Sequence, residues 1–165
     1  MMTRYLANCG LLLVPILVWN VAFARYLPPA LTSDFNRDIP APLLLTENVL
    51  RLVVMVVPFL LPLDVTSPGQ RRGLWLFVAG ALVYATAWIP LMVAPESSWS
   101  KSRLGFLAPA YTPLVWLVGL GLTGRRFFWS VPFEPWMYLL LAGAFVMVHF
   151  AHAHLAYQRA RAALP

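Results

Sequence analysis

The chain has 165 residues, of which 61% are hydrophobic and only 11% are charged. Soluble domains carry about 25% charged residues, and a chain of this length cannot bury so much apolar surface in one core. The composition therefore excludes a soluble globular domain, and it also excludes a disordered chain, which would be poor in apolar residues. The formal net charge is +6. Its basic residues lie between apolar runs, so lipid phosphates are their expected partners and nucleic acid is not.

Five apolar stretches follow one another along the chain. Each has about 20 residues, the length that crosses a hydrocarbon layer of roughly 30 Å as a helix. The stretches are residues 5–24, 43–63, 74–94, 104–123 and 136–157. The sequence thus predicts an all-α integral membrane protein, a single membrane domain built as a bundle of five transmembrane helices.

The numbers of basic residues on the two sides of the membrane are nearly equal, so they do not decide the orientation of the bundle. With five crossings, five Lys and Arg residues lie on the side of the N-terminus, called here the first side. Six lie on the opposite side, called here the second side, which holds the 25–42 and 95–103 loops and the C-terminus. On the first side the arginines form the pairs Arg71–Arg72 and Arg125–Arg126 beside helix ends, whereas the second side has long loops rich in Pro, Ser and Asp. We therefore expect a cytoplasmic N-terminus, in a bacterial inner (plasma) membrane.

Two formal charges, Glu47 and Arg51, lie within the five stretches, both in the second one. Charged side chains inside a membrane face the bundle interior or a cavity, because facing lipid is costly. Glu47 and Arg51 are four residues apart, so they share a helix face and can pair, and Asn48 flanks that face. The second stretch starts on the second side, which places Glu47 roughly 6 Å and Arg51 roughly 12 Å deep.

The fifth stretch carries three histidines and ends on the same side. His149 and His152 share a helix face. Counted back from the end of the stretch, they lie roughly 12 Å and 8 Å deep, which matches the depths of Arg51 and Glu47. We therefore expect Glu47 and Arg51 to meet His149 or His152 inside the bundle.

Polar and aromatic residues of the other stretches fall in the same half of the membrane, which predicts a polar pocket near the second side. The candidate ligand-binding residues are Glu47, Asn48, Arg51, Tyr84, Trp88, Tyr111, His149 and His152. The N-termini of two helices lie near this pocket and add partial positive charge. Together with Arg51, they favour an anionic or carbonyl-bearing head group over a cation.

Three functions are compatible with this pattern. The first, which we favour, is binding of an amphipathic small molecule or a lipid head group. The second is a membrane-embedded enzyme that uses Glu47 with His149 or His152, either as acid and base or as ligands of a metal. The third is a small subunit or carrier of a larger complex, or a homo-oligomer, in which the polar cluster serves assembly or transport. A purely structural role of the cluster, as a buried ion pair that fixes helix packing, is a further alternative.

No cofactor and no resident metal are predicted. All three histidines lie in one stretch, so a haem could not be held by histidines from two facing helices of this chain. A single cysteine, Cys9, excludes dithiol chemistry within the chain. In its length, its number of expected spans and its seven tryptophans the chain resembles the tryptophan-rich translocator proteins in outline. That resemblance is one of size and composition, and no residue role follows from it.

Overall fold

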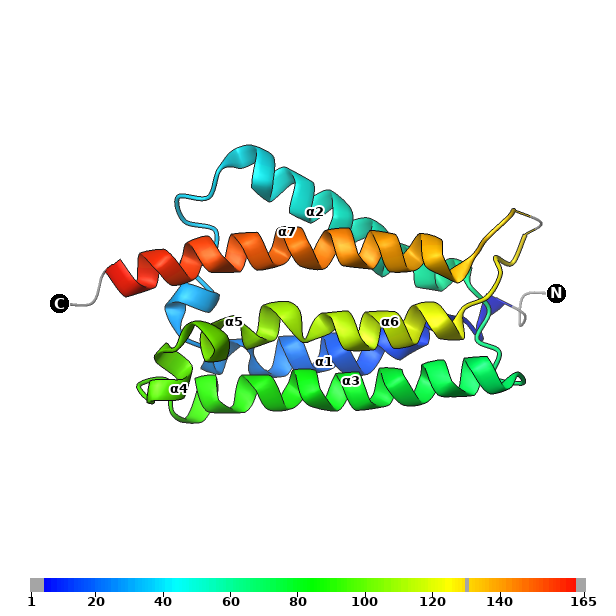
Figure 1. Cartoon of the computed structure of the whole chain (residues 1–165), viewed down its shortest axis with the longest axis horizontal. Helices are drawn as coiled ribbons and strands as arrows, with labels where there is room; N and C mark the ends of the chain where they lie inside the picture. The colour runs from blue at the N-terminus through cyan, green and yellow to red at the C-terminus, as the bar shows by residue number, and fades with distance from the viewer. Residues whose placement is uncertain (1–4, 130, 163–165) are drawn as a thin grey trace.

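The computed structural model describes residues 5–129 and 131–162. Within these ranges the chain forms five helices that are long and apolar enough to cross a membrane, and no strand. They lie roughly side by side along the long axis of the molecule (Figure 1). Their bounds are Cys9–Tyr26, Ala41–Leu60, Pro68–Val93, Arg103–Thr123 and Pro135–Ala162. The predicted all-α bundle of five apolar helices is thereby confirmed.

Three of the spans are composite. The first joins η2 (Cys9–Leu12), α1 (Leu13–Phe23) and η3 (Ala24–Tyr26), the second joins α2 (Ala41–Val56) and η5 (Val57–Leu60), and the fourth joins α5 (Arg103–Tyr111) and α6 (Pro113–Thr123). The third and fifth are the single helices α3 (Pro68–Val93) and α7 (Pro135–Ala162). Two short helices, η4 (Pro29–Leu31) and α4 (Ser98–Lys101), lie in the loops of the second side.

Two helices extend past the apolar stretches that predicted them. Ser67 and Gln70 form a capping box at the start of α3, which therefore begins at Pro68 and takes Arg71 and Arg72 into its first turns. The helix α7 continues to Ala162, and its 28 residues span about 42 Å, more than the hydrocarbon layer is thick. Both extensions place arginines where lipid head groups would lie.

The tightest helix pair is α3 with α6, and glycines permit its close approach. A Cβ atom on Gly80 would lie 2.4 Å from the backbone nitrogen of Trp116, and one on Gly119 would lie 2.2 Å from that of Phe77. Real Cβ atoms do not approach so closely, so the two backbones touch because these positions lack side chains.

The fourth span bends where α5 meets α6. Pro113 has no backbone N–H and cannot continue the hydrogen-bond ladder of α5, while Thr112 donates from Oγ1 to the carbonyl of Ala108 at 2.7 Å. A second proline, Pro109, lies inside α5. The helix is therefore broken at the level of the cavity described below.

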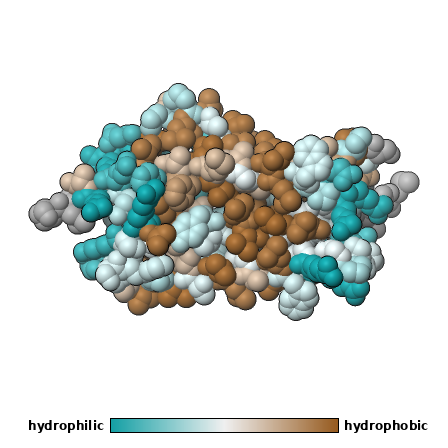
Figure 2. Space-filling model, in the orientation of Figure 1, coloured by the Kyte–Doolittle hydropathy of each residue, from teal (hydrophilic) through white to brown (hydrophobic). Residues whose placement is uncertain are grey.

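The outer surface matches a protein that spans a bilayer. A hydrophobic band crosses the middle of the molecule, and hydrophilic residues gather at both ends (Figure 2). Large apolar side chains in that band are exposed, among them Val21, Leu52 and Met147. The chain is thus a multi-pass membrane protein. Within the bundle α7 packs against α2, α5 and α6, whereas α1 and α2 are not packed along one another.

Candidate functional site

Glu47 lies at the centre of a hydrogen-bonded cluster between α2 and α7. Its side chain is fully buried. One carboxylate oxygen, Oε1, accepts from Arg51 one turn further along α2 and lies 2.9 Å from Nδ1 of His149. The other oxygen, Oε2, is hydrogen-bonded to Nδ1 of His152. The predicted meeting of Glu47 with His149 or His152 inside the bundle is confirmed, and Arg51 joins the cluster through its hydrogen bond to Glu47.

The hydrogen bonds of His152 require one proton on Nε2 and a second proton between Nδ1 and Glu47. Its Nε2 is 3.0 Å from the backbone carbonyl of Phe35, and a carbonyl can only accept, so Nε2 carries a proton. A second proton must lie between Nδ1 and Glu47, because two lone pairs facing each other would repel. That proton is held either by His152 beside an ionised Glu47 or by Glu47 beside a neutral His152.

The cluster therefore carries positive charge. In either protonation state the Glu47–His152 pair is neutral as a whole, and the guanidinium of Arg51 adds one positive charge. The Arg51 side chain is 43% exposed whereas that of Glu47 is fully buried, so the cation is the member of the pair that remains accessible. This agrees with the preference for an anionic or carbonyl group inferred from the sequence.

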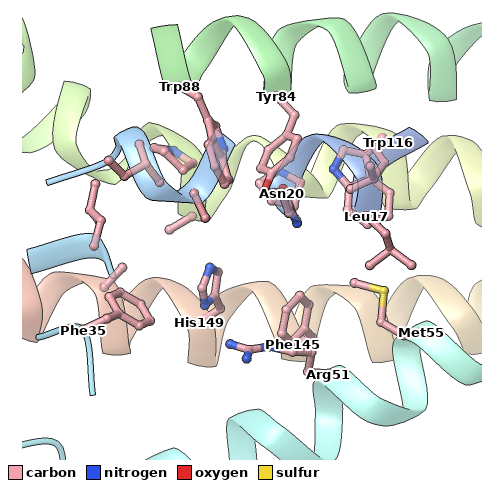
Figure 3. Close-up of a pocket in the computed structure, with 18 of the residues that line it drawn as sticks. Leu17, Asn20, Phe35, Arg51, Met55, Tyr84, Trp88, Trp116, Phe145 and His149 are labelled. Carbon is pink, nitrogen blue, oxygen red and sulfur yellow. Dashed lines mark hydrogen bonds between the residues drawn. The ribbon is translucent and has the colours of Figure 1, made fainter. Parts of the chain in front are cut away.

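A cavity of about 340 Å³ lies beside the cluster and is lined by residues of all five spans. Most of its wall is apolar and aromatic. Its polar groups are Asn20 from α1, Arg51 from α2, Tyr84 and Trp88 from α3, Trp116 from α6 and His149 from α7. Figure 3 shows Trp88, Tyr84, Asn20 and Trp116 on one wall and His149 with Phe145 and Arg51 on the opposite wall. Figure 3 also places Phe35 at one end of the cavity and Leu17 with Met55 at the other.

The eight candidate residues from the sequence take different places around this cavity. Four of them, Arg51, Tyr84, Trp88 and His149, line it, while Glu47 and His152 are buried in the cluster beside it. Asn48 is exposed on α2 and is not part of the lining. Tyr111 donates its hydroxyl to the carbonyl of Leu104 at 3.2 Å and also lies outside the lining.

Three serines of the segment before and at the start of α5, Ser98, Ser100 and Ser102, are not part of the cavity lining. Ser102 caps α5 through a hydrogen bond from the backbone N–H of Gly105, and Ser100 donates to backbone carbonyls of the preceding segment. They shape the loop, so the pocket is less polar than the sequence pattern predicts.

Three further residues belong to the site and are not among the eight candidates. Phe35 comes from a loop, and its ring stacks on His152 with ring centroids 4.1 Å apart while its carbonyl binds the same imidazole. Asn20 accepts from the Tyr84 hydroxyl at 2.7 Å, a pairing that its place near the end of the first stretch could have suggested. The sequence pattern suggests only a packing role for Trp116, because in an apolar helix nothing distinguishes a residue that lines a cavity from one that contacts a neighbouring helix.

The cluster does not have the geometry of a metal centre. Among the described residues no group of three or more His, Cys, Asp or Glu side chains converges on a point that could hold an ion. The Nδ1 atoms of His149 and His152 instead point at different oxygens of one carboxylate. The donors therefore satisfy one another, which is the geometry of a proton-sharing cluster.

Comparison of the chain with known proteins finds no family model, no curated protein and no solved structure that matches it. The function is therefore argued from the geometry of the site alone.

Proposed function

We propose that this membrane protein binds an amphipathic small molecule or a lipid in the cavity, with the head group at Arg51. The observation that carries the proposal is the pairing of a largely apolar cavity of about 340 Å³ with one accessible, positively charged group on its wall. Ligand sites of this kind bury an apolar body and orient it through a few polar contacts. The cation at Arg51 supports an anionic or carbonyl-bearing head group.

The ligand would enter from the bilayer, between α1 and α2. These two helices are not packed along one another, and residues of both, Leu17 and Met55, line the cavity. Leu17 is 45% exposed. A hydrocarbon chain could therefore remain in lipid while its head group reaches Arg51.

The test is ligand retention through purification. Three proteins are purified in the same detergent: the wild type, the double variant Glu47→Gln/Arg51→Gln and the control Arg72→Gln. Bound molecules are then extracted and identified by mass spectrometry. Glutamine keeps the shape and hydrogen-bonding capacity of the cluster and removes its charges. Because a buried ion pair often barely offsets its desolvation, we expect the double variant to stay folded.

We expect an amphiphile on the wild type and on Arg72→Gln, whose exposed arginine lies outside the cavity, and none on the double variant. Full retention in a folded double variant would contradict the proposal and leave the cluster a packing role.

A second candidate function is general acid–base catalysis on a bound amphiphile. It is favoured by the 2.9 Å contact between Glu47 Oε1 and His149 Nδ1. A carboxylate in that position holds the proton on Nδ1 and leaves the Nε2 lone pair free to act as a base. His149 also lines the cavity, where a substrate would lie.

The two functions differ in what happens to the ligand. The extracted molecule is incubated with the wild type and with His149→Gln, and its conversion is followed by mass spectrometry. Conversion by the wild type but not by the variant supports catalysis. Recovery of the unchanged molecule from both leaves binding as the function.

Assembly is the third proposal, as a homo-oligomer or as a subunit of a larger complex in the bacterial inner membrane. It is supported by the extent of exposed apolar surface, although lipid would cover the same surface. Light scattering of the purified protein, corrected for detergent, gives its mass in solution. A single mass of one chain, with no co-purifying protein, would contradict this proposal.

A further inference from the structure

Donor groups lie on both walls of the cavity, and two of them, the indole N–H groups of Trp116 and Trp88, have no acceptor among the described residues. Trp116 is 2% exposed, it lines the cavity, and its indole N–H has no hydrogen-bond partner among the described residues. A buried N–H without an acceptor is costly and rare in native proteins, so it requires an explanation. An acceptor atom on a bound ligand would supply one.

The neighbours of Trp116 on this wall are donors as well. Asn20 uses its side-chain oxygen to accept from Tyr84, which leaves its amide N–H groups for a ligand. The buried N–H of Trp88, which also lines the cavity, has no hydrogen-bond partner among the described residues. This wall therefore offers hydrogen atoms to an oxygen placed near Asn20 and Trp116 (Figure 3).

The opposite wall holds the second set of donors. Arg51 donates to Glu47 through one nitrogen, and the remaining N–H groups of its guanidinium are free to bind a ligand in the cavity that it lines. A ligand that satisfies both walls must carry acceptor oxygens on two opposite sides. A fatty acid has acceptors only at its head, so its chain would leave Trp116 unpartnered.

Aromatic rings between these donors favour a flat ligand. Tyr84 makes edge contacts with Trp88 and with Trp116, with ring centroids 5.7 Å and 6.4 Å apart. On the other wall Phe145 lies parallel to His149, with centroids 5.5 Å apart. Aromatic surfaces on two sides suit a planar ring that packs against them.

From these observations we infer that the ligand is a cyclic dicarbonyl compound of the quinone class, a flat ring with two opposed carbonyl oxygens and an apolar tail. The inference rests on the proposed function and narrows its ligand. One carbonyl accepts from Arg51, and the other accepts from Trp116 and Asn20. The tail leaves between α1 and α2, past Leu17 and Met55.

The test compares three probes with tails of nine or ten carbons: decyl-ubiquinone, its quinol and decanoate. Binding to the purified protein in detergent is measured by titration calorimetry. Trp116→Phe removes the N–H and keeps an aromatic ring. Trp19→Phe is the matched control, because the Trp19 N–H is also buried without a partner but Trp19 does not line the cavity.

We expect the quinone to bind more tightly than the quinol, since a quinol hydroxyl beside the N–H groups of Asn20 and Trp116 carries a hydrogen atom that meets donors there, whereas a quinone carbonyl only accepts. We expect Trp116→Phe to weaken quinone binding about five- to tenfold, the effect of one lost hydrogen bond, and Trp19→Phe to leave it unchanged. If Trp116→Phe does not fold, Asn20→Leu probes the same wall, and weaker quinone binding by that variant is the expected result.

Equal quinone affinity in folded Trp116→Phe and wild type overturns the inference. Binding of decanoate without binding of the quinone also overturns it, but leaves the proposed amphiphile site intact. Binding of no probe, by a protein that also retains no amphiphile on purification, overturns both.

Discussion

The imidazole of His152 on α7 is hydrogen-bonded to the carboxylate of Glu47 on α2, and both side chains are completely buried. The second nitrogen of the same ring binds the carbonyl of Phe35 in the loop between the first two spans. One side chain thus joins three separate segments, and it holds them at the level of the cavity. The stability of the bundle and the shape of the site therefore depend on the same contacts.

Removing His152 should destabilise the protein far more than removing Arg51. His152→Ala leaves the fully buried Glu47 without the partner of its Oε2 atom, and breaking a buried pair in this way costs about 3–5 kcal/mol. Arg51→Gln removes a partner that is 43% exposed and leaves Glu47 hydrogen-bonded to both histidines, so we expect a smaller loss. Thermal denaturation of the two variants in one detergent measures the order. A larger loss for Arg51→Gln would show that the charge pair, and not the imidazole, holds α2.

The α3–α6 contact predicts a contrast between two glycine substitutions. Gly119→Ala forces a methyl group against the backbone of Phe77, and such overpacking costs about 1–3 kcal/mol. Gly143→Ala adds the same group where no atom lies within 4 Å. It should be neutral or stabilise α7 by up to about 1 kcal/mol, since alanine is the better helix former. Equal melting temperatures for both variants would contradict the close approach of the two helices.

The gap between α1 and α2 predicts that a bulky side chain at Leu17 hinders ligand entry. Leu17→Trp should slow binding of the quinone or of any retained amphiphile, because Leu17 lines the cavity at its exposed end. Val21→Trp is the control, since Val21 is 84% exposed and lies outside the lining. Association rates are measured by stopped-flow quenching of tryptophan fluorescence. Equal rates in the two variants would place the entrance elsewhere.

The orientation of the protein can be decided by labelling single cysteines in intact cells. With Cys9 replaced by alanine, Thr66→Cys and Ser98→Cys place thiols in loops on opposite sides. Both positions are exposed, and neither is the helix cap, a role that belongs to Ser67 and Ser97. From the paired arginines we expect an impermeant reagent to label Ser98→Cys and not Thr66→Cys. The reverse pattern means that the N-terminus lies outside.

The sequence by itself determined the five helices and the partners of the charged cluster. Apolar runs of about 20 residues leave a chain in lipid no other way to satisfy its backbone than as helices. The cost of exposing charge to lipid placed Glu47 and Arg51 inward. Because helical rise converts residue number into depth, His149 and His152 could be assigned to the same level.

Only the tertiary structure decided which of the remaining residues form the cavity. Phe35 comes from a loop, whose path no periodicity describes, and it reaches His152 because that loop folds back over α7. Trp116 faces the cavity because glycines let α6 approach α3 to backbone contact. Tyr111 lies outside the lining and donates its hydroxyl to the carbonyl of Leu104 in the same helix. In a uniformly apolar helix the neighbouring elements decide which residues face the cavity. That choice depends on packing that the sequence pattern does not contain.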